Sequence, residues 1–243
     1  MAKSKLHHRV LGLVIFFVIA VAPGVSSQTS STAPEGSVLA VLAVDPGAGK
    51  FIKRATAFHI GDGVFFTNAH VVRGAPLPAN FTEMYLAGTT AARVRDAWMG
   101  PISVSCVNAK WHGDGDGDRA YPFDVARVTV PQGSLLPPGL TVSPKWPELG
   151  AHVTIMGFAA ASHAWPPKLY TATGHISSVN DSAQTFVIDV EAGFALEGSS
   201  GSPVLNSSNE VIGILYARQG TRDRSAADKV AAVWASAMLA SCK

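Results

Sequence analysis

The stretch Glu197-Gly198-Ser199-Ser200-Gly201-Ser202-Pro203-Val204-Leu205 holds a serine between glycines just before an apolar run. Glycines permit a sharp turn, and the backbone N–H groups of such a turn can face a developing negative charge. These are the requirements of a nucleophilic hydroxyl, so Ser200 is the candidate nucleophile. A Gly/Ser/Pro turn that only joins two strands is the alternative. The motif alone does not separate the two interpretations, and the rest of the chain must do so.

The composition is typical of a β protein. The chain has 243 residues, of which 23 are Gly and 15 are Pro, and it is rich in Val, Thr and Ala, a composition that fits short strands joined by tight turns. This length predicts one larger β domain or two small ones with a sizeable core. Charged residues make up 15% and the net charge is +2, which argues against nucleic acid as a main partner.

The N-terminus has the pattern of a targeting segment. Basic residues within the first nine positions precede an apolar run, Val10–Ala22, and Pro23-Gly24 follows. The run is short for a membrane span, and the small residues Val25-Ser26-Ser27 offer a cleavage site. We therefore expect a signal peptide over 1–27 and export to the periplasm or the medium. A retained anchor is the alternative, and only then would the chain contact a membrane.

Residues 28–36 are rich in Ser, Thr and Pro, which predicts a flexible leader. Two cysteines, Cys106 and Cys242, follow in the rest of the chain. In an exported protein they could form one disulfide, but the sequence does not fix the distance between them.

The chain from residue 37 onward alternates short apolar runs with turn signals, and we predict an all-β domain over 37–243. The clearest hairpin joins Ala55–Ile60 to Val64–Thr67 across Gly61-Asp62-Gly63. A short C-terminal helix capped by Ser236 follows the last strand, and a longer helix from Ala226 is the alternative. The remaining predicted strands are Ser37–Val44, Ala92–Val94, Ile102–Val107, Ala151–Gly157, Lys168–Val179, Thr185–Val190, Val211–Tyr216 and Val230–Trp234.

Two further polar residues stand where strands begin or end. His70 follows the second hairpin strand, a position from which a general base can reach another part of the fold. Asp124 opens a predicted strand with the apolar flanks Phe123, Val125, Ala126 and Val128, and a carboxylate there needs a partner such as a histidine N–H. A structural histidine and a turn aspartate are the respective alternatives.

The segment Trp111–Arg119 alternates Gly and Asp and invites a calcium-loop interpretation. An EF-hand loop requires glycine at its sixth place and glutamate at its twelfth, where this chain has Arg119 and Val125. We therefore expect a solvated loop and no metal site, with an incidental ion as the minor alternative.

The order His70, Asp124, Ser200 restricts the reaction class. An α/β-hydrolase places its histidine after the serine, whereas the last histidine here is His175. A subtilisin-like enzyme would need an early acid and an alternating βαβ pattern, which the sequence lacks.

Three motifs together resemble the chymotrypsin-like serine proteases, and among them the exported HtrA-type branch. They are Thr67-Asn68-Ala69-His70-Val71-Val72, Phe123-Asp124-Val125-Ala126 and Gly198-Ser199-Ser200-Gly201-Ser202-Pro203. The resemblance runs from about Ser37 to the C-terminus. It implies two six-stranded antiparallel β-barrels with the active site between them.

The resemblance also implies a role for each site residue. Ser200 would attack the scissile carbonyl, His70 would take and return the proton, and Asp124 would orient the imidazole. The backbone N–H groups of Gly198 and Ser200 would form the oxyanion hole. No metal or organic cofactor is required.

The chain departs from the family pattern around this constellation. Ser199 replaces the aspartate that pairs with a freed N-terminus in digestive members, so activation by that ion pair is not expected. Phe194 stands at the base of the implied specificity pocket, which disfavours a preference for Lys or Arg. Tyr216 and Arg218 follow where a pocket wall would be, and Arg218 could favour an acidic group or be a solvated loop charge. The sequence ends soon after the predicted barrels, so we do not expect the PDZ domain that HtrA-type proteins usually carry.

We therefore expect an exported serine endopeptidase that acts on protein or peptide substrates. The main alternative is an inactive pseudoprotease that serves as a binding module, because a collapsed loop at Glu197–Ser200 would misdirect the N–H groups. An esterase on the same fold is a further alternative, since it shares the chemistry and differs only in substrate.

Overall fold

The computed structural model describes residues 34–45, 47–48, 50–73, 83–89, 98–109, 124–158, 165–190, 198–219 and 229–242. All of these residues belong to one compact unit, Thr32–Lys243. The predicted signal peptide and most of the predicted leader lie outside them, and residues 34–36 belong to a 3-10 turn, η1 (Pro34–Ser37). None of the described helices is both long and apolar enough to cross a membrane.

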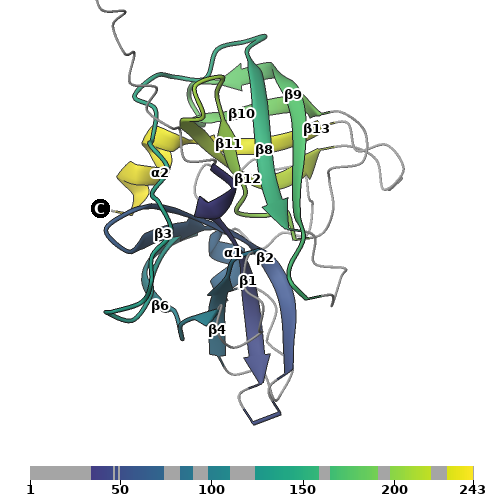
Figure 1. The fold of residues 1–243 in the computed structure, drawn as a ribbon. Helices are drawn as coiled ribbons and strands as arrows, with labels where there is room; N and C mark the ends of the chain where they lie inside the picture. The colour runs from purple at the N-terminus through teal and green to yellow at the C-terminus, as the bar shows by residue number, and fades with distance from the viewer. Residues whose placement is uncertain are drawn as a thin grey trace, which may run out of the picture. The chain divides into compact units, whose positions relative to one another are not determined.

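The first half of this unit is an antiparallel sheet of seven described strands in the order β5-β4-β1-β2-β3-β7-β6 (Figure 1). A short helix, α1 (Ala69–Arg73), follows β3 and contacts β6 and β7. The strands are β1 (Val38–Asp45), β2 (Lys50–Gly61), β3 (Val64–Thr67), β4 (Glu83–Ala87), β5 (Trp98–Met99), β6 (Ser103–Ala109) and β7 (Asp124–Thr129).

The second half is a closed barrel of six antiparallel strands in the order β10-β13-β12-β11-β8-β9, drawn in green and yellow in Figure 1. Helix α2 (Ala235–Ser241) follows β13 and packs against β12. The strands are β8 (His152–Phe158), β9 (Leu169–Asn180), β10 (Thr185–Val190), β11 (Pro203–Leu205), β12 (Val211–Gln219) and β13 (Lys229–Trp234).

This architecture confirms the predicted all-β, chymotrypsin-like fold with a short C-terminal helix. The six-strand expectation holds for the C-terminal barrel. The N-terminal sheet has a seventh, two-residue strand, β5, and its edge strands β5 and β6 do not pair with each other among the described residues. The strand predicted at Ala92–Val94 and the Asp-rich loop lie outside the described residues.

Strand β1 is buried on both faces, which explains its almost wholly apolar sequence. Leu39 and Val41 enter the core of the N-terminal sheet. Ala40 and Leu42 enter a second cluster that also contains Ile155 of β8. The two halves of the unit therefore share a hydrophobic core, and the strands that line it are fixed relative to each other.

The hairpin between β2 and β3 has the turn that its sequence predicts. Asp62 and Gly63 both have positive φ, 51° and 70°, which is the geometry of a type I′ turn. Because this turn fixes the register of β3, it also fixes where β3 ends and where the residues after Thr67 lie.

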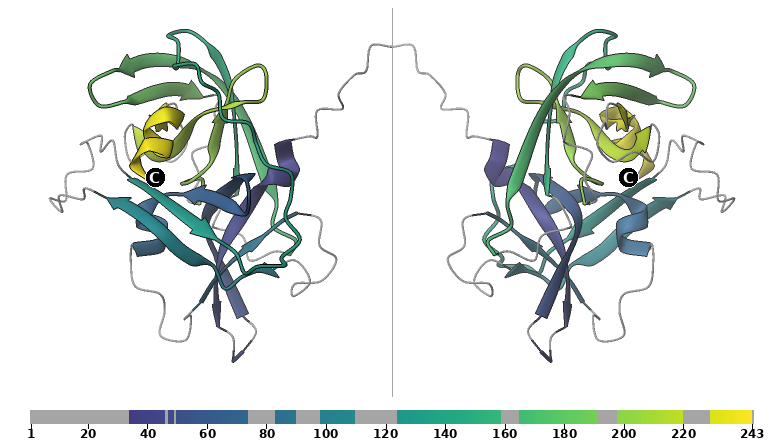
Figure 2. Two further views of the ribbon diagram at one scale, coloured as in Figure 1. Left: turned by 90° about the vertical axis from the view of Figure 1, so that its left-hand side faces the viewer. Right: turned by 90° about the vertical axis from the view of Figure 1, so that its right-hand side faces the viewer.

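The C-terminus corrects one prediction and answers one open question. Helix α2 begins after Trp234, and its N-cap has no side-chain hydrogen bond, so Ser236 is inside the helix and is not its cap. Residues 229–234 are a strand, which rules out a helix running from Ala226. Cys106 of β6 and Cys242 form a disulfide with a Cα–Cα distance of 5.6 Å, which joins the N-terminal sheet to the C-terminus. Figure 2 shows the C-terminus beside the strands of that sheet.

Candidate active site

His70 lies in helix α1, one residue after its start. The sequence predicted a strand end, and the structure instead has a single helical turn directly after β3. The turn contacts β7, the strand that Asp124 opens. The short helix therefore presents His70 to the beginning of a strand that is more than fifty residues away in the sequence.

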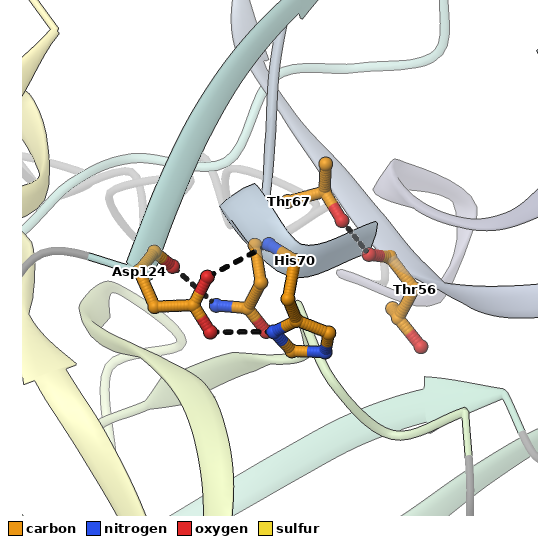
Figure 3. Close-up of polar contacts among 5 residues, drawn as sticks. Thr56, Thr67, His70 and Asp124 are labelled. Atoms are coloured by element: carbon orange, nitrogen blue, oxygen red, sulfur yellow. Dashed lines mark hydrogen bonds and ion pairs between the residues drawn. The ribbon is translucent and has the colours of Figure 1, made fainter. Parts of the chain in front are cut away.

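His70 and Asp124 form a two-point contact (Figure 3). The His70 Nδ1–H donates to Asp124 Oδ2 at 2.5 Å, and the His70 backbone N–H donates to Oδ1 at 2.9 Å. The two side chains are 32% and 16% exposed, so the pair is partly shielded from water. Because Asp124 engages Nδ1, the neutral ring keeps Nε2 as a proton acceptor, which is the tautomer that a general base requires.

Asn68 holds the backbone on the other side of this pair. Its Nδ2 donates to the carbonyl oxygen of Asp124 at 2.7 Å, and the residue is fully buried. Asn68 Oδ1 has no hydrogen-bond partner within the described residues. The segment that carries His70 is thus joined to Asp124 by side-chain and backbone contacts at once.

Thr56 of β2 connects the N-terminal sheet to the serine loop, defined here as Gly198–Ser202. Its carbonyl accepts a hydrogen bond from Thr67 Oγ1 at 2.7 Å (Figure 3). Its hydroxyl donates to the Gly198 carbonyl at 3.0 Å and accepts from the Phe158 N–H at 2.9 Å. Its N–H donates to the Ser200 carbonyl at 2.9 Å. One threonine therefore holds the backbone of the candidate nucleophile and that of Gly198, two residues before it.

The other side of the serine loop is fixed by the C-terminal barrel. The Gly201 N–H donates to the Leu215 carbonyl at 2.9 Å, and the Leu215 N–H donates to the Ser202 carbonyl at 2.9 Å. Gly201 has φ +84°, and a Cβ there would lie 2.1 Å from the Thr56 carbonyl oxygen and 2.7 Å from Thr67 Oγ1. Only glycine fits, and its backbone lies against Thr67, three residues before His70.

The two N–H groups that the family resemblance implies for the oxyanion hole are free of hydrogen bonds to the described residues. The N–H groups of Gly198 and Ser200 donate no hydrogen bond to another described residue. The Ser200 side chain likewise has no hydrogen bond, to His70 or otherwise, within the described part of the chain. In an unliganded site, such contacts often tighten only when substrate binds.

A sequence profile of the trypsin-like peptidase domain matches residues 55–214. This range is more than half of the chain and includes all three candidate catalytic residues. The chain belongs to the trypsin-like peptidase domain family. The match begins and ends in strands that contact the serine loop, β2 and β12.

Solved structures of Rv3671c from M. tuberculosis have a similar fold. The active form of that protease matches at 18% identity with a TM-score of 0.56, covering 86% of this chain and 80% of that chain. A serine-to-alanine mutant in the inactive form matches at 18% identity with a TM-score of 0.55, covering 93% of this chain and 95% of that chain. At this identity the likeness concerns the fold alone.

In this trypsin-like peptidase domain, Tyr216 lies near enough to Asp124 to feel its charge. Its hydroxyl is buried without a hydrogen-bond partner among the described residues. Burial, and then the negative charge of Asp124, raise the pKa of Tyr216 to about 12. The strand pairing between β12 and β13 shifts register between Leu215 and Ala217, so Tyr216 is the extra residue of a β-bulge. Such a bulge can redirect a side chain, here one beside the peptidase site.

The three pocket residues proposed from the sequence have different outcomes. Phe194 lies outside the described residues, and so does the side chain of Arg218. Tyr216 is described, and its role in a pocket stays a prediction.

Sequence reasoning missed three features of the candidate site: the hydrogen bonds of Thr56, the bond from Asn68 to Asp124, and the effect of Asp124 on Tyr216. Asn68 is part of the motif that contains His70, so the sequence could have indicated a role for it near this site. Thr56 lies within an ordinary strand pattern and gave none, because its contacts come from β8 and the serine loop, which are remote in sequence.

Proposed function

We propose that this chain is an exported serine endopeptidase in which Ser200 is the nucleophile, His70 the general base and Asp124 the residue that orients it. The two-point contact of His70 with Asp124 carries the proposal. A solvent-exposed histidine with a structural role does not require a carboxylate that accepts hydrogen bonds from both its ring and its backbone N–H. The family membership supports the same conclusion, because it makes peptide-bond hydrolysis the expected reaction.

The first half of the reaction transfers an acyl group to Ser200. His70 Nε2 takes the Ser200 proton as the oxygen attacks the scissile carbonyl carbon. The carbonyl π bond opens, and the negative charge collects on its oxygen. Asp124 stabilises the imidazolium that forms. His70 then gives the proton to the leaving amine as the C–N bond breaks, which leaves an ester on Ser200.

Water completes the cycle by the same route. His70 takes a proton from the water as its oxygen attacks the ester, and returns it to Ser200 as the ester bond breaks. The N–H groups of Gly198 and Ser200 are suited to bind the oxyanion in both halves. Loss of one such donor typically costs about 10²–10³ in turnover.

The test is covalent labelling of the purified protein with a fluorophosphonate probe, which reacts with activated serines. We expect labelling of the unsubstituted chain, none of Ser200→Ala, and loss of labelling in His70→Ala. Ser199→Ala is the matched control, because it removes the neighbouring hydroxyl and leaves Ser200 in place; it should still be labelled. Correct folding of each variant is checked by circular dichroism.

Two results would contradict the proposal. A folded wild-type chain that resists the probe would favour a binding module with an incompetent site. Labelling that survives in Ser200→Ala would place the reactive group elsewhere. Parallel assays with matched peptide and ester substrates separate an endopeptidase from an esterase, because only the former cleaves internal peptide bonds.

Export is part of the proposal and has its own test. We expect the chain to be processed after Ser27, which intact-mass measurement of the protein recovered outside the cytoplasm would detect. A mass that retains residues 1–27 would instead indicate an anchor.

A further inference from the structure

Lys53 is a buried cation on β2. The residue is only 5% exposed. Its ammonium forms no ion pair and no hydrogen bond within the part of the chain that the structure describes. Lys229 provides the contrast, because it is half-exposed and paired with Asp189 at 3.0 Å. A lysine that is buried without an anion is costly for the fold, since burial disfavours its charged form.

The strand register shows which way Lys53 projects. Lys53 lies directly opposite Leu42 of β1, and residues directly opposite each other in an antiparallel pair share a face of the sheet. Leu42 belongs to the hydrophobic cluster that includes β8 of the C-terminal barrel, and Phe51 packs against the same cluster. Lys53 therefore lies on the face of β2 that is turned to the second half of the domain. β2 and β8 contact each other (Figure 1).

An aromatic contact bounds this position. The rings of Phe51 and Trp165 are 5.4 Å apart, edge to face, and bring together β2 and the segment before β9. Phe51 and Lys53 are two residues apart on one strand, so their side chains lie on the same face. Lys53 thus shares a face of β2 with an aromatic residue that packs on the core, and burial lowers the pKa of Lys53.

Lys53 is also close to the serine loop along β2. Thr56, three residues later, donates its N–H to the Ser200 carbonyl. Three strand residues span roughly 10 Å, which is also about the length of three residues of an extended peptide. A substrate held at Ser200 in an extended conformation could therefore place a side chain two or three residues from the scissile bond near Lys53.

We propose that Lys53 is a specificity-determining residue that binds a carboxylate of the peptide substrate two or three residues from the scissile bond. A carboxylate there would form a charge-assisted hydrogen bond with the ammonium and would supply the anion that the described residues do not provide. The inference rests on the proposed function for the position of the substrate. It concerns binding, so it can be tested separately from catalysis.

The binding test uses the Ser200→Ala protein, which cannot turn over. Three fluorescently labelled, degenerate octapeptide pools are titrated by fluorescence anisotropy. One contains Asp and Glu and has an amidated C-terminus. The second replaces these residues by Asn and Gln, and the third is the neutral pool with a free C-terminus. We expect the acidic pool to bind about 5–10-fold more tightly than the neutral amidated pool, as a desolvated ion pair would produce.

Two further substitutions assign the effect to Lys53. Lys53→Met should abolish the preference, and Lys53→Arg, which keeps the charge, should retain much of it. Lys50→Met is the matched control, because Lys50 is an exposed lysine on the same strand, and its removal should leave the preference intact. Tighter binding of only the third pool would identify a terminal carboxylate as the source of the ligand group.

A cleavage profile gives the position of the acidic residue. Peptides from a digested proteome are treated with the unsubstituted chain, and the new ends are read by mass spectrometry. Asp and Glu should be enriched at one position, two or three residues from the cleaved bond, and this enrichment should disappear with Lys53→Met.

The inference is overturned if none of the carboxylate pools binds preferentially, or if the preference survives Lys53→Met. A fluorophosphonate-reactive chain with no carboxylate preference would remove this inference and leave the proposed function intact. A chain that binds acidic peptides through Lys53 but does not react with the fluorophosphonate would support this inference and contradict the proposed function.

Discussion

The Asn68 side chain donates a hydrogen bond to the Asp124 carbonyl at 2.7 Å, so the residue two places before His70 holds the residue that pairs with His70. Together with the two bonds from His70 itself, this contact fixes the Asp124 backbone and carboxylate with three donors from one short segment. The geometry of the proposed general base therefore depends on a buried amide.

Asn68→Ala should reduce the rate of fluorophosphonate labelling by about tenfold or more, because displacement of Asp124 changes the orientation of the His70 ring. It should also lower stability by about 1–3 kcal/mol, since the Asp124 carbonyl loses its partner. Asn206→Ala is the matched control. Asn206 accepts two backbone N–H bonds in a turn, and its removal should lower stability without slowing labelling. Equal labelling rates in the two variants would contradict a positioning role for Asn68.

Tyr216 should make stability fall as the pH rises from 10 toward 12. Its pKa of about 12 in the folded chain lies above the ordinary 10.0, so the unfolded chain releases this proton first. The folded state then binds more protons than the unfolded state, and the free energy of unfolding decreases by up to about 1.4 kcal/mol per pH unit. Tyr216→Phe should remove most of this slope in urea unfolding at pH 9.5 and 11.

Tyr85→Phe is the control for that measurement, because the pKa of Tyr85 is also raised, by burial and by Glu83. Both residues are partly buried, but the Tyr216 hydroxyl is itself buried without a partner among the described residues, whereas the Tyr85 hydroxyl donates to Glu83, so Tyr85 should contribute less to the slope. A slope that Tyr216→Phe leaves unchanged would show that the Tyr216 hydroxyl is not buried in the folded chain.

The disulfide should contribute about 2–5 kcal/mol to stability. Cys106 and Cys242 are 136 residues apart, so the bond closes a long loop in the unfolded chain. It also holds β6 near the end of α2, where Asn108 donates to the Ser241 carbonyl at 3.3 Å. Urea unfolding of the Cys106→Ser, Cys242→Ser double variant beside the oxidised protein measures the difference. Equal midpoints would show that the non-covalent contacts suffice.

The fold was largely predictable because its signals are local. The Asp62-Gly63 turn and the apolar runs on either side of it specify a hairpin within a dozen residues, and the structure has that hairpin. The order of His70, Asp124 and Ser200 along the chain was also evident from three local sequence motifs. Helix α1 was not, since five residues are too few to show a helical period.

The parts that sequence could not supply depend on contacts between distant segments. Trp234 precedes α2 without a capping bond because packing of β13 and α2 on the barrel determines where the helix begins, which outweighs the capping preference of Ser236. The burial of Lys53 could not be predicted from the sequence for a related reason. A lysine in a strand normally indicates a solvated face, but here the second half of the domain covers that face.

Gly201→Ala should prevent the serine loop from forming, whereas Gly150→Ala should not. Both glycines have positive φ, +84° and +79°, so the backbone cost of a Cβ is similar at the two positions, about 1–2 kcal/mol. Gly150 has open space around it, but at Gly201 the new carbon would lie 2.1 Å from the Thr56 carbonyl oxygen. Thr56 cannot move away without losing its hydrogen bonds to Ser200 and Gly198.

We therefore expect a folded Gly150→Ala protein that is labelled normally by the fluorophosphonate. Gly201→Ala should have a far lower midpoint of thermal unfolding or, if folded, no labelling. A stable, fully labelled Gly201→Ala protein would show that the serine loop does not depend on its contact with β2.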